Sequence, residues 1–215
     1  MSNNIIGFLG IEKYDILIYL AKLLSADGKK VLIVDNNSNE ALSSCVNIPS
    51  GLNPEKEVVT TKDKDFVKNQ RVAKYEKRYD YILVDFGLSA LHPDIDLCSS
   101  LLLVCDKQFH NQKIMQNIRK QLKQRSEGIY LVIRDVDPEG HYENLEEGLK
   151  FAGCFFLDFD IVDRKKMLML QYGREIKLSN ISYQYKELLE KIMVGILCIE
   201  KKDYEKVLRK LKRGA

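Results

Sequence analysis

Short apolar runs alternate with amphipathic stretches along this chain of 215 residues. Each apolar run has the length of a β-strand, and each amphipathic stretch repeats its apolar residues at helical spacing. The predicted strands cover residues 5–9, 31–34, 58–60, 81–84, 101–104, 129–133 and 155–159. The predicted helices cover residues 15–26, 64–77, 107–124, 142–151, 164–172 and 182–193. This alternation predicts an α/β fold, a three-layer sandwich around a mostly parallel twisted sheet.

The composition is that of a globular domain with a sizeable core, since 45% of the residues are hydrophobic and 30% are charged. The five cysteines lack CxxC spacing, so the sequence predicts neither a zinc site nor a disulfide framework. No apolar run approaches the ~18 residues of a transmembrane helix. We therefore expect a cytoplasmic protein with reduced thiols.

The last residues of the chain are strongly basic. Residues 201–213 carry seven Lys or Arg against two acids, whereas the whole chain has a formal net charge of +3. Tyr204, Val207 and Leu211 recur in this segment at helical spacing. We divide the chain into a domain over 1–197 and a basic amphipathic tail over 198–215. The favoured interpretation is a helix that packs on the domain; the alternative is a helix that lies on an anionic membrane surface.

The first strand, loop and helix of the chain form the natural phosphate site of a parallel α/β fold. In such folds backbone N–H groups and the helix N-terminus both point at the ligand. A working P-loop reads GxxxxGK[ST]. Gly7 and Lys13 fit this pattern, but Glu12 replaces its second Gly and Tyr14 its Ser or Thr.

Several segments in order resemble the MinD/ParA-like P-loop NTPases of the SIMIBI class. Residues 7–35 resemble the family's GKGGVGKTT loop, its first helix ending in LA, and a G-x-KVL strand that ends in Asp. YDYILVDFG, residues 79–87, resembles the family's Walker B strand, YDYIIIDTPPG. The resemblance covers residues 4–194 and implies the P-loop NTPase fold. It places a vestigial nucleotide site at Gly7, Gly10, Lys13, Asp35 and Asp85.

The same resemblance shows which family residues are missing. Phe8 stands at the position of the signature lysine that reaches a partner's nucleotide in the family. Tyr14 stands at the position of the threonine whose hydroxyl coordinates magnesium, and Asp15 follows where a second threonine contacts phosphate. We therefore expect no catalytic residues, no metal site and no bound cofactor, unless the loop still accepts ATP and magnesium.

Two carboxylates, Glu12 and Asp15, would stand beside a bound triphosphate. Their repulsion would cost on the order of 1 kcal/mol each in a solvated site. We expect one of them to cap the first helix, because a helix N-terminus carries unpaired N–H groups and partial positive charge. Lys13, without a phosphate, is then expected to pair with Asp85 or Asp35.

The favoured function is a non-hydrolysing scaffold or localisation protein that acts through protein partners. One alternative is an atypical ATPase that binds ATP through Gly7, Gly10 and Lys13. Another is a membrane- or DNA-associated module that uses the basic tail at the inner membrane face. We do not expect nucleic acid as the main partner, and a homodimer stays open. Arg134 and Asp135 match a family position near adenine, but a solvated turn is favoured there.

Overall fold

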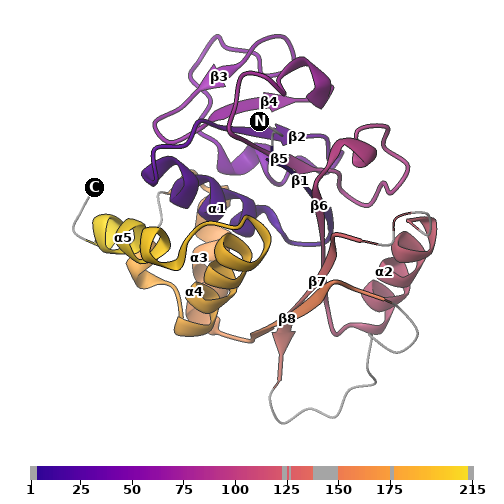
Figure 1. Cartoon of the computed structure of the whole chain (residues 1–215). Helices are drawn as coiled ribbons and strands as arrows, with labels where there is room; N and C mark the ends of the chain where they lie inside the picture. The colour runs from indigo at the N-terminus through magenta and orange to yellow at the C-terminus, as the bar shows by residue number, and fades with distance from the viewer. Residues whose placement is uncertain (1–3, 123–124, 126, 138–149, 175–176, 213–215) are drawn as a thin grey trace.

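The computed structural model describes residues 4–122, 125, 127–137, 150–174 and 177–212 (Figure 1). The predicted helix over 142–151 lies outside the described residues, apart from its last two positions, which are not helical.

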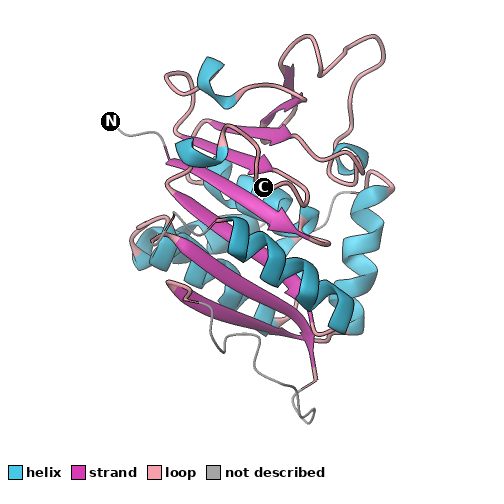
Figure 2. Ribbon diagram, turned by 90° about the vertical axis from the view of Figure 1, so that its right-hand side faces the viewer, coloured by secondary structure: helices cyan, strands magenta, loops and turns pink. Residues whose placement is uncertain are grey.

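The described strands form one sheet with the order β3-β4-β2-β5-β1-β6-β7-β8. Neighbouring strands are parallel, except for the antiparallel pair of β3 and β4. The strands are β1 Asn4–Gly10, β2 Val31–Asp35, β3 Val59–Thr60, β4 Asp65–Lys68, β5 Tyr81–Asp85, β6 Ser100–Asp106, β7 Ile129–Val136 and β8 Gly153–Asp158. Figure 2 shows these strands side by side through the molecule. The mostly parallel sheet confirms the predicted fold class.

Helices cover both faces of the sheet. Their bounds are α1 Tyr14–Ala26, α2 Phe109–Gln121, α3 Ile161–Gln171, α4 Tyr183–Glu190, the π-helix η5 Lys191–Ile196 and α5 Lys201–Lys212. Short 3-10 turns are η1 Ser43–Cys45, η2 Val72–Lys74, η3 Ile95–Leu97 and η4 Leu178–Asn180. One core cluster joins the sheet to α1, α3, α4 and α5, and a second joins its other face to α2. Figure 1 shows α2 apart from the other helices, across the sheet.

The predicted helix over 64–77 is wrong. Its first part is strand β4, in which Phe66 and Val67 are fully buried, and its second part contains only the 3-10 turn η2. Strand β4 pairs with β2 in parallel, with Val67 beside Val34. Pairing with a central strand therefore outweighs the local preference of a charged segment, because strand formation depends strongly on tertiary neighbours.

Parallel pairing brings the carboxyl ends of the central strands to one edge of the sheet. Asp35 at the end of β2 is in register with Asp85 at the end of β5, and Asp85 is in register with Phe8 of β1. The loop that joins β1 to α1 begins at the same edge. The fold thus gathers the predicted site residues from segments that are far apart in the sequence.

The basic tail forms helix α5, which packs against α1. Tyr204 and Val207 are buried, and the Tyr204 hydroxyl donates a 2.8 Å hydrogen bond to the carbonyl of Lys186. Lys210 donates from Nζ to the carbonyl of Ala26, the last residue of α1, at 3.2 Å. The prediction of a helix packed on the domain is confirmed, and its apolar side is not available to a membrane in this arrangement.

Across the described part of the chain, no helix combines the length and the apolar character that crossing a membrane requires.

Candidate functional site

Strand β1 continues through Gly10, so only residues 11–13 connect it to α1. Gly7 lies inside the strand, in register with Leu101 of β6. A Cβ atom on Gly7 would lie 2.6 Å from Leu101 Cδ2 and 2.7 Å from the Phe86 ring. Gly7 therefore allows close packing within the core and is not part of the connecting loop.

The backbone of the loop is bound to the sheet. Gly10 donates from its N–H to the carbonyl of Gly87 at 2.8 Å, and Ile11 donates to the carbonyl of Val104 at 3.0 Å. Gly10 has a φ of +110°, and a Cβ atom there would lie 1.9 Å from the Val104 oxygen. Only glycine fits this approach. In P-loops, backbone N–H groups at this position bind phosphate. Here two of them donate to backbone carbonyls of the protein instead.

Lys13 and Asp85 form a buried ion pair at the centre of the site. Lys13 Nζ lies 2.8 Å from Asp85 Oδ1, and each side chain is 2% exposed. The same ammonium donates to the carbonyl of Gly10 at 2.8 Å. Asp85 also accepts from the N–H of Gly87 at 2.8 Å and from Nδ2 of Asn37 at 3.4 Å. The predicted pairing of Lys13 with Asp85 is confirmed.

Asp35 does not contact Lys13. Its carboxylate accepts the N–H of Ser43 at 2.9 Å, the Ser43 hydroxyl, and the N–H of Asn37 at 3.1 Å. Burial raises the pKa of Asp35 above its ordinary value, although the Ser43 hydrogen bond opposes this shift. Asp35 therefore orders the segment that follows β2, and Asn37 links it to Asp85.

The prediction that Glu12 or Asp15 caps α1 is wrong. The N-cap residue is Lys13, and no side chain caps the helix. Both oxygens of Asp15 instead accept from the two terminal nitrogens of Arg134, each at 2.8 Å, and the Tyr185 hydroxyl donates to Oδ2 at 2.7 Å. The buried guanidinium of Arg134 requires a charged partner, and Asp15 supplies it instead of capping the helix.

The solvated turn favoured for Arg134 is also wrong. Arg134 lies in β7 with its side chain almost fully buried, and it donates to the carbonyl of Glu12 as well as to Asp15. Glu12 has a φ of +41°, and its carboxylate accepts from Arg164 Nη1 at 2.6 Å. Arg164 also pairs with Asp135, at 2.5 Å. Arg134 and Arg164 therefore both bind Glu12 and hold the loop of residues 11–13 in place.

Sequence reasoning missed Tyr185 and Arg164 as members of this site. Both lie on helices more than a hundred residues beyond the loop, and nothing in their local pattern marks them. Arg134 carried a signal, because it directly follows the apolar run Ile129–Ile133 within β7. A charged residue in a strand is rarely buried unless it is paired.

A cavity of about 270 Å³ lies over the ion pair. Its lining includes Glu12, Lys13, Tyr14, Asn37 and Asp85. Ligand sites typically enclose roughly 300–1,000 Å³, so this cavity is below their usual range. The Tyr14 ring is buried, and burial raises the pKa of its phenol well above the ordinary value. The phenol therefore remains protonated and cannot offer a charged ligand to a metal.

Large apolar side chains are exposed at the same edge of the sheet. Leu91 follows β5 and is 77% exposed, and Phe109 follows β6 and is 68% exposed. Ile161 and Val162, after β8, are also exposed. We call Leu91, Phe109, Ile161 and Val162 the apolar edge. Exposed apolar groups near one site are typical of protein contact surfaces.

No protein-family model matches the chain, and no curated protein does so either. Solved structures do resemble it. MinD of Aquifex aeolicus in a MinC:MinD complex is 15% identical, with a TM-score of 0.65 over 99% of this chain and 96% of that chain. Cyanothece McdA in complex with ATP is 13% identical, with a TM-score of 0.61 over 94% and 99%. The pNOB8 ParA bound to nonspecific DNA is 13% identical, with a TM-score of 0.54 over 99% and 100%.

These likenesses span nearly the whole of each chain. The structural similarity establishes the fold, which is that of the ParA/MinD-type P-loop NTPases, as the sequence predicts. At sequence identities this low it establishes the fold alone. The residues of the loop, by contrast, form contacts within the protein. The fold alone does not determine the function, which depends on the residues of the site.

Proposed function

We propose that this protein is a localisation or partition protein of the ParA/MinD fold that does not hydrolyse ATP and acts through protein contacts. The buried ion pair of Lys13 with Asp85 carries the proposal. A lysine that contacts phosphate must keep its charge available, whereas this one is neutralised by a carboxylate at 2.8 Å.

The residues present do not fit Mg-ATP. Phosphoryl transfer depends almost wholly on positioned charges around the phosphates and the metal. Phe8 is fully buried in β1 and Tyr14 has no aliphatic hydroxyl, so neither supplies such a charge or metal ligand. The N–H groups of Gly10 and Ile11 are already bonded to carbonyls. Binding would have to break these bonds and the ion pair.

The apolar edge supports protein contacts as the mode of action. Leu91 and Phe109 expose most of their side chains after strands β5 and β6, at the edge of the sheet where the loop of residues 11–13 also begins. In the Aquifex complex, the similar MinD is assembled with MinC. A surface of this kind can bind a partner without any nucleotide, since burial of apolar area drives most protein association.

Phosphate release and calorimetry test the first half of the proposal. The protein should release no phosphate from Mg-ATP above a control without protein, and titration with Mg-ATP should give no binding heat at low-micromolar affinity. Phosphate release that Asp85→Asn abolishes would overturn the proposal.

Partner capture tests the second half. Proteins cross-linked to the full chain in its native cells should be lost with Leu91→Asp/Phe109→Asp. Tyr183→Asp, an equally exposed aromatic position on α4, is the matched control and should keep them. If both variants capture the same proteins, the apolar edge is not the contact surface.

A second candidate function is binding to an anionic polymer or surface through α5. Its apolar side is packed on α1, while Lys202, Lys206 and Arg209 are exposed on the other side. The similar pNOB8 ParA binds nonspecific DNA, so our expectation against nucleic acid is not supported. Lys206→Glu/Arg209→Glu should remove salt-sensitive DNA binding and leave the packed side intact, because phosphate contacts release counterions. Unchanged DNA binding would exclude this surface.

A further inference from the structure

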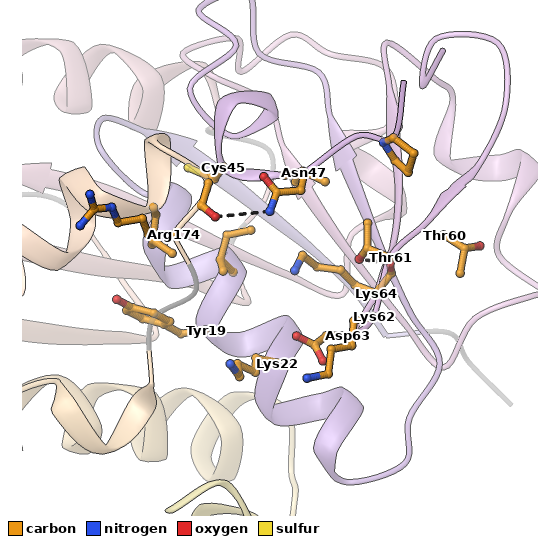
Figure 3. A pocket seen from close by; sticks show the side chains of 15 residues that line it. Tyr19, Lys22, Cys45, Asn47, Thr60, Thr61, Lys62, Asp63, Lys64 and Arg174 are labelled. Carbon is orange, nitrogen blue, oxygen red and sulfur yellow. Dashed lines mark hydrogen bonds between the residues drawn. The ribbon is translucent and has the colours of Figure 1, made fainter. Parts of the chain in front are cut away.

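A second cavity, of about 350 Å³, lies beside α1 and shares no lining residue with the cavity over the ion pair of Lys13. Residues from four separated segments line it: α1, the segment 45–49 that begins at the end of η1, the turn between β3 and β4, and the end of α3. Figure 3 shows these segments around one hollow, which we call the Lys64 cavity. Its volume falls within the usual range of small-molecule sites.

The charge of the lining is strongly one-sided. Among the described residues that line the Lys64 cavity, four are cationic and one is acidic: Lys22, Lys62, Lys64 and Arg174 against Asp63. Figure 3 shows the Lys64 side chain reaching toward the middle of the hollow, whereas Arg174 lies on the opposite side from Lys62 with its guanidinium directed away from the lysines. A concave surface lined by one sign of charge focuses its potential and concentrates counter-ions.

Two of the cations, Lys62 and Lys64, lie on a short turn whose backbone is hydrogen-bonded. Thr61 donates to the carbonyl of Lys64 from its N–H at 2.9 Å and from its hydroxyl at 2.7 Å. The Ser25 hydroxyl of α1 donates to the carbonyl of Asp63 and ties the turn to the last part of the helix. Lys62 and Lys64 therefore start from a fixed backbone, which lowers the entropy that a ligand must overcome.

The other walls of the Lys64 cavity are apolar or neutral. Ile18, Val46 and Leu170 line it, and all three are buried core residues. Thr60 and Thr61 add hydroxyl groups beside the lysines. Such a lining matches a ligand with a charged oxyanion head and a small apolar body. Ammonium and guanidinium groups are the usual partners of phosphate and carboxylate.

We propose that the Lys64 cavity binds a small organic anion, whose phosphate or carboxylate contacts Lys62 and Lys64 while its apolar part packs on Ile18 and Leu170. The site is separate from the loop at Lys13 and does not depend on the function proposed above.

Calorimetry of the full chain at constant ionic strength tests this proposal. Phenyl phosphate serves as the probe, benzoate distinguishes a carboxylate head, and inorganic phosphate and phenol report each half alone. At least one of the two aromatic anions should bind saturably at concentrations up to about 10 mM, and more tightly than either inorganic phosphate or phenol.

Charge-removal variants localise the binding. Lys62→Gln/Lys64→Gln should weaken it about tenfold or more, as expected for lost charge-assisted hydrogen bonds. Arg174→Gln, on the opposite side of the cavity, removes a more distant charge and should weaken binding less than the lysine pair does. Lys120→Gln/Lys165→Gln removes the same charge from α2 and α3 and should change nothing. Absence of saturable binding by both anions, or equal weakening in the control pair, would overturn the proposal.

Discussion

Arg134 on β7 and Asp15 on α1 form a bidentate ion pair, with both N–O distances at 2.8 Å, although the two residues are 119 positions apart in the sequence. The Tyr185 hydroxyl donates to the same carboxylate, and burial raises the pKa of this phenol well above its ordinary value. Tyr185 therefore remains a hydrogen-bond donor at ordinary pH. The three side chains join the first turn of α1 to the sheet and to α4.

Removing Asp15 should destabilise the fold strongly. Asp15→Asn leaves the buried Arg134 guanidinium without a charged partner, which typically costs about 3–5 kcal/mol. Urea unfolding followed by circular dichroism measures the loss. Asp96→Asn, at an exposed position, should stay within about 0.5 kcal/mol of the parent. Similar losses of stability in both variants would show that the buried pair contributes no more to the free energy of unfolding than an exposed carboxylate does.

Local patterns were sufficient for much of the fold. The bounds of β1, β2, β5, β6 and α1 were predicted to within a few residues. The strands are continuous apolar runs and the helix repeats its apolar residues at helical spacing, so the local pattern is sufficient. Lys13 and Asp85 could be paired because parallel strands that share one edge bring their ends together.

Contacts between distant segments were not readable in the same way. Strand β4 forms because Phe66 and Val67 pair with β2. The local sequence of this short charged segment does not indicate that β2 lies beside it. Asp15 was expected to cap a helix, since its local sequence offers no sign of Arg134. The competition between a cap and a buried cation is decided only by tertiary structure.

Restoring family residues in the loop should not restore ATP binding. Glu12→Gly/Tyr14→Thr removes one carboxylate and supplies a hydroxyl, but the N–H groups of Gly10 and Ile11 remain bonded to Gly87 and Val104. Calorimetry with Mg-ATP should therefore match the parent protein. Micromolar affinity in the variant would mean that the Glu12 and Tyr14 side chains alone prevent ATP binding in the parent protein. Adding Asp15→Thr is expected to lower stability, as argued above.

The cysteines should differ sharply in reactivity. Burial raises the pKa of Cys98 and of Cys105 to about 12 from 9, so their thiolate fraction at neutral pH falls about a thousandfold. Cys198 is exposed. Iodoacetamide at pH 8, followed by mass spectrometry, should label Cys198 first. Early labelling of Cys98 or Cys105 in the folded protein would contradict this order.

The same two thiols predict a fall in stability at high pH. In the unfolded chain they release protons near pH 9, whereas in the folded protein they keep them up to about 12. The unfolded state therefore binds fewer protons above pH 9, and stability falls as the pH rises toward 12. Urea midpoints measured from pH 7 to 11 should show a shallower fall for Cys98→Ala/Cys105→Ala than for the parent.

Helix α5 should depend on its packed side. Val207 is buried against the domain, so Val207→Asp places a charge in an apolar contact and should cost about 2–4 kcal/mol. Lys206→Asp changes the neighbouring exposed position and should have little effect. Hydrogen exchange over 201–212 measures whether the helix is released. Equal protection in both variants would contradict the packing of α5 on α1.

A double-mutant cycle on Lys13 and Asp85 separates a buried pair from a solvated remnant. Lys13→Met and Asp85→Asn should each cost about 3–5 kcal/mol, because each leaves one buried charge unpaired. The double variant should cost less than the sum, with a coupling of roughly 0.5–3 kcal/mol. Lys191 and Glu187 provide the matched control, since their pair is 2.7 Å long, close to the 2.8 Å of Lys13 and Asp85, but their side chains are 53% and 43% exposed. Water screens that pair, so its coupling should be only ~0–1 kcal/mol. Equal couplings would show that burial adds nothing at the loop, and strict additivity for Lys13 and Asp85 would show that the two charges do not meet in solution.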